Sequence, residues 1–249
     1  MELDDKIIIV TGGASGIGRA TSRLLASLGA TVCIGDLDQA GAERVADEQK
    51  GEVGRIHGAL LDMGDAGSVK AFAAAVLEQH GRVDGLVNAA GFDKVEPFMK
   101  NDPALWDRLM AVNLLGAIRL TQLVLPSMIA AKAGKIVNIA SDAGRVGSMG
   151  ETVYAATKGG LIAFTKSLAR EMARYQVNVN CVCPGPTDTP LFNSQVTEGL
   201  REALLSAIPF RRLGEPEDVA QAVRYLVGPN SNYVTGQVLS VSGGLTMVG

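Results

Sequence analysis

The sequence predicts an α/β fold, a Rossmann-type doubly wound seven-stranded parallel sheet with helices on both faces. Short runs rich in Val and Ile alternate with longer stretches whose apolar residues recur at helical spacing. Continuously apolar strands are typical of parallel sheets that are covered on both sides. No Pro-, Gly- or Ser-rich linker and no internal repeat divides the chain. We therefore expect a single domain over residues 1–249.

The alternation can be followed from one end of the chain to the other. A β-branched run such as KIIIVT at Lys6–Thr11 predicts a strand, and apolar residues three or four apart predict a helix. The expected strands are Lys6–Thr11, Thr31–Asp36, Arg55–Leu61, Gly85–Ala89, Lys135–Ser141, Val177–Cys183 and Gln237–Val241. The expected helices are Ile17–Leu28, Gly41–Gln49, Val69–Gln79, Pro103–Ala131, Val153–Arg174 and Pro216–Val227.

Only Pro184–Pro216 forms a long stretch outside this alternation. Connections of that length in compact domains tend to be functional, so we expect a substrate lid over about residues 186–214. Within it, Val196, Leu200, Leu204 and Ile208 recur every fourth residue and predict a helix with one apolar stripe. This stripe either covers an apolar substrate or packs on the core or on a neighbouring subunit.

Composition excludes several classes of function. The formal net charge is −3 and no run of Lys or Arg is present, which argues against nucleic-acid and membrane partners. Apolar stretches are expected to fall short of a membrane span, and the acidic start is unlike a secretory leader, so we expect a cytoplasmic protein. The C-x-C spacing with one distant Cys and only two His does not fit a structural zinc site, and the shortage of His argues against a Ser-His-Asp hydrolase. We expect no bound metal.

A glycine-rich turn, TGGASGIG, joins the first predicted strand to the first helix. Small residues there let the backbone approach a pyrophosphate, and the N–H groups that open a helix can bind it. We therefore expect a dinucleotide to contact Gly12, Ser15, Gly16, Ile17 and Gly18. The alternative is a glycine-rich turn that binds no ligand.

Asp36 ends the second predicted strand, where an acidic residue can accept hydrogen bonds from an adenosine ribose and repel a 2′-phosphate. Neither Ala14, Ser15 nor Leu37 supplies the cation that a 2′-phosphate would need. These residues predict NAD rather than NADP as the cofactor. The alternative is that Asp36, like Asp38, only caps the next helix.

Tyr154 and Lys158 are four residues apart at the start of a predicted helix, so their side chains share one face. Ser141 precedes them at the carboxyl end of the fifth predicted strand, the edge at which such sheets bind ligands. A tyrosine needs nearby positive charge to act as a base near neutral pH, and the Lys158 ammonium and an oxidised nicotinamide would supply it. With Ser141 on the substrate oxygen, the three side chains form a proton-transfer site.

Together these motifs resemble the short-chain dehydrogenase/reductase family over the whole chain. The matching residues are Thr11–Gly18, Asp36, Asp62, Asn88–Gly91, Asn113, Ser141, Tyr154, Lys158 and Pro184–Gly185. The resemblance implies a catalytic tetrad of Ser141, Tyr154, Lys158 and Asn113, with the asparagine completing a proton relay through water. It also implies a homotetramer built on the helices at 103–131 and 153–174.

The same resemblance implies further cofactor contacts, at Asp62, Met63, Asn88, Gly91, Tyr154, Lys158, Pro184, Gly185, Thr187 and Thr189. Two positions depart from the family pattern. Ala89 stands where a second asparagine is usual, and Thr187 stands where an apolar residue is usual. Neither change removes a group that the chemistry requires.

Longer strings, such as GETVYAATKGGL and GQVLSVSGGLTM, resemble the 2-hydroxycyclohexanecarboxyl-CoA dehydrogenase-like members of the family. This implies NAD-dependent oxidation of a cyclic or branched β-hydroxyacyl-CoA to the β-ketoacyl-CoA. Arg145, Arg211 and Arg212 either meet the CoA phosphates or are solvated surface arginines. The enzymatic alternatives are a 3-oxoacyl thioester reductase and a cyclic secondary-alcohol dehydrogenase. The alternative from another class is a dinucleotide-binding regulatory protein without turnover.

Overall fold

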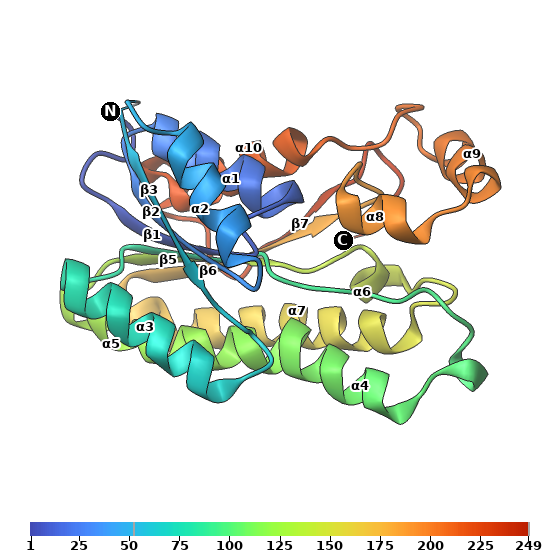
Figure 1. Cartoon of the computed structure of the whole chain (residues 1–249), viewed down its shortest axis with the longest axis horizontal. Helices are drawn as coiled ribbons and strands as arrows, with labels where there is room; N and C mark the ends of the chain where they lie inside the picture. The colour runs from blue at the N-terminus through green and yellow to red at the C-terminus, as the bar shows by residue number, and fades with distance from the viewer. Residues whose placement is uncertain (52, 249) are drawn as a thin grey trace.

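The computed structural model describes residues 1–51 and 53–248, so positions 52 and 249 of the predicted domain lie outside the described residues. Seven parallel strands form one sheet in the order β3-β2-β1-β4-β5-β6-β7, which confirms the predicted fold class (Figure 1). The strands are β1 Ile7–Thr11, β2 Thr31–Asp36, β3 Arg55–Leu60, β4 Gly85–Asn88, β5 Gly134–Ile139, β6 Val177–Pro184 and β7 Val238–Val241.

Helices cover both faces of the sheet, and a separate apolar core fills each side. On one face lie α1 Gly16–Ser27, α2 Gln39–Glu48 and α10 Pro216–Val227 (Figure 1). On the other lie α3 Ala66–His80, α4 Pro103–Met110, α5 Ala117–Ala131 and α7 Thr152–Met172. The short helices α6 Ala143–Val146, α8 Pro190–Gln195 and α9 Glu198–Ala207 lie beyond the carboxyl ends of the strands.

Local sequence explains where the helices begin. Asp38 caps α2 and Asp65 caps α3, each by accepting hydrogen bonds from backbone N–H groups of the first turn. Proline opens α4, α8 and α10, where its missing N–H has no intrahelical partner to lose. Ser15 is the N-cap residue of α1 but makes no side-chain capping bond, and α1 has no acidic residue in its first turn. The start of α1 therefore has no side-chain anion of its own.

The predicted helix over Pro103–Ala131 is continuous, but its middle, Ala111–Gly116, is π-helical. Such widened turns occur often at functional sites. An 18-residue window of this helix has mean hydropathy 1.6, so by length and composition it could cross a membrane, contrary to the sequence-based expectation. In the fold, Leu120, Val124 and Met128 of this helix pack in the core beneath the sheet.

Candidate active site

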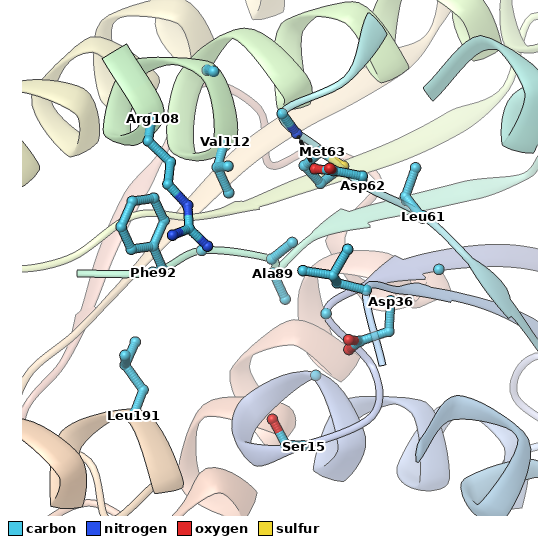
Figure 2. A pocket seen from close by; sticks show the side chains of 18 of the residues that line it. Ser15, Asp36, Leu61, Asp62, Met63, Ala89, Phe92, Arg108, Val112 and Leu191 are labelled. Carbon is cyan, nitrogen blue, oxygen red and sulfur yellow. Dashed lines mark hydrogen bonds between the residues drawn. The ribbon is translucent and has the colours of Figure 1, made fainter. Parts of the chain in front are cut away.

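A cavity of about 730 Å³ opens at the carboxyl edge of the sheet, between the first four strands, α4 and α8 (Figure 2). Ligands bind at this edge in open α/β sheets because the helix N-termini and the connecting loops meet there. Ten of the predicted cofactor contacts line the cavity: Gly12, Ser15, Gly16, Ile17, Gly18, Asp36, Asp62, Met63, Gly91 and Thr189.

The glycine-rich turn forms one wall of this cavity. Gly12 and Gly16 have φ angles of +70° and +49°, which side chains with a Cβ rarely adopt. A Cβ on Gly18 would lie 2.1 Å from the Gly12 carbonyl oxygen, so helix α1 packs directly against the turn. With no side-chain acceptor of its own, the first turn of α1 presents its N–H groups to an anion in the cavity.

Asp36 lies at one end of the cavity with both carboxylate oxygens held by backbone N–H groups. Ala14 N–H donates to Oδ2 and Asp38 N–H donates to Oδ1, each at 2.9 Å. Helix α2 is capped by Asp38, which accepts from Gly41 N–H, so the capping alternative holds for Asp38 and not for Asp36. The fixed carboxylate can accept from hydroxyl groups and would repel a phosphate.

The remaining predicted cofactor residues lie outside the lining of this cavity. Asn88 is buried and donates from Nδ2 to Asn138 Oδ1 at 2.8 Å, so its amide supports the sheet interior. Thr187 donates to the Gly185 carbonyl at 2.9 Å, just after Pro184 ends β6. The residues at 184–187 therefore lie at the start of the segment that was predicted to be a lid.

Ser141, Tyr154 and Lys158 meet where β5 ends and α7 begins. Strand β5 ends at Ile139, two residues earlier than the prediction required, and Ser141 follows in the connecting loop. Ser141 Oγ accepts from Ala143 N–H at 3.1 Å and lies near enough to Tyr154 to lower its pKa, and Lys158 Nζ lies 5.5 Å from the centre of the Tyr154 ring. Lys158 Nζ donates to the Ile139 carbonyl at 2.9 Å, which fixes the ammonium beneath the tyrosine.

Asn113 lies in the π-helical segment and binds the loop that follows β4. Its Oδ1 accepts from Phe92 N–H at 3.0 Å, and its Nδ2 donates to the Phe92 carbonyl at 2.9 Å. A Cβ on Gly91 would lie 3.2 Å from Asn113 Oδ1 and 3.3 Å from Lys158 Nζ. Gly91 therefore lies where Asn113, Lys158 and the cavity come together.

Burial controls the charge of the two titrating groups. It raises the pKa of Tyr154, and the carboxyl groups of Asp93 and Glu151 raise it further, whereas the nearby Ser141 hydroxyl lowers it. Burial also lowers the pKa of Lys158 to about 8, because the ammonium loses its hydration. Proton removal from Tyr154 therefore depends on a further positive charge in the cleft.

Asp93 and Glu151 form a carboxyl pair that the sequence analysis missed. Burial and the hydrogen bond with Glu151 raise the pKa of Asp93 to about 7. The two residues are far apart in the sequence, and they meet because Glu96 N–H donates to the Gly150 carbonyl at 3.0 Å, which joins their loops. No local pattern could have paired them.

Arg108 is a second group that the sequence analysis missed. Its guanidinium lies 4.6 Å from the centre of the Phe92 ring, and both residues line the cavity (Figure 2). Arg108 precedes Val112 by one helical turn, so the two residues share one face of the helix. The helical spacing within 103–131 could therefore have indicated that Arg108 faces the cavity.

The structure corrects the extent of the helix that was predicted from the apolar stripe. Helix α9 spans only Glu198–Ala207, so Val196 and Ile208 lie outside it, and Leu200 is 43% exposed. The three arginines considered for CoA phosphates each have partners within the protein. Arg145 donates to Ser240 Oγ and the Val248 carbonyl, Arg211 to the Ser206 carbonyl, and Arg212 pairs with Asp218.

This arrangement defines an oxidoreductase that binds a nicotinamide dinucleotide. A parallel sheet carries a glycine-rich βα turn, and the side chains of Ser141, Tyr154 and Lys158 lie at its carboxyl edge. A family model described as enoyl-(acyl carrier protein) reductase matches residues 12–246. The chain belongs to the short-chain dehydrogenase/reductase family, as its motifs predicted, and this family acts on CH–OH groups with a nicotinamide dinucleotide.

Similar proteins carry related names. The chain is 40% identical to 3-oxoacyl-[acyl-carrier-protein] reductase of Thermotoga maritima over 99% of this chain and 100% of that one. It is 43% identical to acetoacetyl-CoA reductase of Synechocystis over 97% and 96%. It is 38% identical to (2S)-[(R)-hydroxy(phenyl)methyl]succinyl-CoA dehydrogenase subunit BbsD of Thauera aromatica over 99% of both. The crystal structure of levodione reductase matches with a TM-score of 0.93 and 30% identity, over 97% of this chain and 98% of that chain.

Proposed function

We propose that the protein is an NAD-dependent dehydrogenase that oxidises a cyclic or branched β-hydroxyacyl-CoA to the β-ketoacyl-CoA. The observation that carries the cofactor half of this proposal is the fixed carboxylate of Asp36 at one end of the cavity. The chemistry rests on Ser141, Tyr154 and Lys158 at the carboxyl edge of the sheet.

The residues present fit a nicotinamide dinucleotide. The uncapped start of α1 would hold its pyrophosphate, and Asp36 would accept hydrogen bonds from the adenosine ribose. Asp62 and Met63 line the same wall and would flank the adenine. A 2′-phosphate would place its charge against Asp36 and meet no cation at Leu37, which favours NAD over NADP.

When bound, the dinucleotide accepts hydride from the alcohol carbon and adds positive charge to the cleft. Ser141 would hold the substrate oxygen and Tyr154 would remove its hydroxyl proton. Lys158 would stabilise the tyrosinate, because its ammonium lies near the ring and is fixed by the Ile139 carbonyl. Asn113 holds the Phe92 backbone through both amide atoms, and the water relay expected of it stays a prediction.

The substrate half of the proposal is supported by relatives whose names refer to CoA thioesters. A second candidate is a 3-oxoacyl thioester reductase that works toward the alcohol, and the 40% identity with the Thermotoga maritima reductase favours it. A cyclic secondary-alcohol dehydrogenase is the remaining enzymatic alternative. The alternative from another class is a regulatory protein that binds the dinucleotide and catalyses no reaction.

One turnover screen separates these candidates. Purified protein is assayed for NADH production with free cyclic alcohols and with the CoA thioesters of the matching β-hydroxy acids, and for NADH or NADPH oxidation with the β-keto thioesters. We expect the highest kcat/KM with NAD and a thioester. Equal kcat/KM for the free alcohol contradicts the CoA assignment, and activity only with NADPH and a β-keto thioester favours the second candidate. Dinucleotide binding without turnover on any substrate favours the regulatory alternative.

A further inference from the structure

The two ends of the lid are joined at its base. Thr187 and Gly214, at its two ends, form a parallel β-bridge. Asp188 N–H donates to the Gly214 carbonyl at 2.8 Å, and Gly214 N–H donates to the Pro186 carbonyl at 3.0 Å. The segment is attached again after α9, where Ile208 is buried and Phe210 N–H donates to the Gly243 carbonyl at 3.2 Å, so α8 and α9 lie between two attached ends.

Little holds the two lid helices down. Neither α8 nor α9 contains a buried residue, and both project beyond the end of the sheet (Figure 1). Most polar contacts of the lid stay within it: Asn193 and Arg201 bind Asp188, and Ser194 donates to the Leu191 carbonyl. The apolar anchor of the lid, Ile208, follows α9, so at α8 itself polar contacts across the cleft decide whether the helix stays closed.

Gln195, the last residue of α8, makes that contact. Its Nε2 donates to the Asp93 carbonyl at 2.6 Å, and its Oε1 accepts from Val95 N–H at 3.1 Å. One planar amide thus binds a donor and an acceptor two residues apart in the opposite loop, as a neighbouring strand would. Among residues 1–51 and 53–248, these are the only hydrogen bonds that join 190–207 to the protein outside the lid.

The loop on the other side of this contact is connected to the catalytic groups. Asn113 holds the backbone of Phe92, and the Asp93 carboxyl faces Glu151 and Tyr154. On the lid side, Leu191 lines the cavity one turn before Gln195 (Figure 2). A closed Gln195 contact therefore holds α8 over the cavity and fixes it to the loop beside the tyrosine.

We propose that Gln195 is a positioning residue that latches the lid to the loop after β4 and so governs entry to and exit from the cleft. Breaking the latch leaves the proton-transfer groups in place. It frees α8 to move away from the cavity between the attached ends at Thr187 and Ile208, exposes Val95 N–H to water and speeds the release of bound nucleotide. Of these consequences, only the faster release of nucleotide rests on the proposed function.

Hydrogen exchange measured by mass spectrometry tests the latch in the protein without ligand. Gln195→Ala should speed exchange about tenfold in the peptide that contains Val95, because that N–H loses its acceptor. Ser194→Ala is the matched control, since its hydroxyl bonds only to its own helix. Gln195→Glu keeps the acceptor and loses the donor at neutral pH. Exchange of the Val95 peptide in this variant should therefore be faster than in Ser194→Ala and slower than in Gln195→Ala. Equal exchange in Gln195→Ala and Ser194→Ala would overturn the proposal.

Stopped-flow release of NADH, followed by its fluorescence, tests the consequence for the cleft. Gln195→Ala should release NADH about tenfold faster than the wild type, and Ser194→Ala should not. If the wild type binds no NADH while the exchange result is as expected, the latch is supported and the proposed cofactor is wrong. If NADH binds and leaves both variants at the wild-type rate, the lid does not govern release and the proposal is wrong.

Discussion

The nucleotide wall and the lid face each other across one cavity, yet they are built in opposite ways. Strands β1 and β2 and the turn into α1 are held by buried apolar side chains and by backbone contacts that leave no room for a methyl group. Helices α8 and α9 bury none of their residues and reach the body through Gln195 alone among the hydrogen bonds of the described residues. A fixed wall can select a cofactor, and a loosely held lid can admit and release it.

Tyr154 lies between these two regions, and its substitution is expected to lower activity more than any other change. Tyr154→Phe keeps the packing of the ring and removes only its oxygen, so kcat should fall by about 10² or more while the Kd for NADH stays near the wild-type value. Steady-state kinetics and a fluorescence titration measure the two quantities. Wild-type turnover in this variant would show that the proton is removed elsewhere.

Two glycines provide a matched test of packing in the two regions. Gly18→Ala places a methyl group 2.1 Å from the Gly12 carbonyl oxygen, so Tm should fall by about 5 °C or more. Gly199→Ala, in α9, meets no atom within 4 Å and should raise Tm by about 2 °C through helix propensity. Thermal melts followed by circular dichroism compare the variants. Similar Tm changes at both sites would contradict the difference in packing.

The fixed wall should also set cofactor choice. Asp36→Ala with Leu37→Arg removes the carboxylate and supplies a cation, so the ratio of kcat/KM for NAD over NADP should fall about tenfold or more. Leu37→Arg alone is the control, because it adds the cation and keeps Asp36. If the ratio is unchanged in the double variant, Asp36 does not read the ribose.

A smaller effect is expected at Asp93, which faces Glu151, Tyr154 and Lys158 while the adjacent Lys94 pairs with Glu96. The pKa of Asp93 is raised to about 7, so the carboxyl ionises as the pH rises through that value and then opposes loss of the Tyr154 proton. Asp93→Asn removes this charge, and the rising limb of the pH–rate profile for oxidation should move to lower pH by less than about one unit.

The pH dependence of the free energy of unfolding should also change in Asp93→Asn. A carboxyl whose folded pKa lies above its unfolded value stabilises the fold below about pH 4 and loses that contribution as the pH rises to about 7. Urea unfolding of Asp93→Asn should therefore depend less on pH over this window than unfolding of the wild type. Glu96→Gln is the control for a charge lost from the same loop. Parallel stability curves for wild type and Asp93→Asn would contradict the raised pKa.

The sequence predicts the fixed region well because its signals are local. A strand, a glycine-rich turn and a helix start follow one another within a short stretch, and Gly18 packs against the backbone of Gly12 in the same turn. The positions of Ser141, Tyr154 and Lys158 could likewise be predicted, because Ser141 follows a strand and the other two begin a helix. Strand β5 nevertheless ends before Ser141. These groups converge because parallel strands end at one edge of the sheet.

The lid escapes prediction because tertiary contacts decide it. The apolar stripe from Val196 to Ile208 has helical spacing, but Ile208 is buried just after α9 ends while Leu200 stays exposed. The pairing of Asp93 with Glu151 and the contact of Gln195 with the loop after β4 join residues distant in the sequence. Spacing along the chain carries no information about such pairs.

The central claim is that Asp36, held by two backbone N–H groups, makes this cavity a site for NAD. Titration of the wild-type protein with NADH and with NADPH, followed by nucleotide fluorescence in the same buffer, tests it most directly. Repulsion of the 2′-phosphate by the fixed carboxylate predicts a Kd for NADH that is lower by about tenfold or more. Equal Kd values, or tighter binding of NADPH, would contradict the claim.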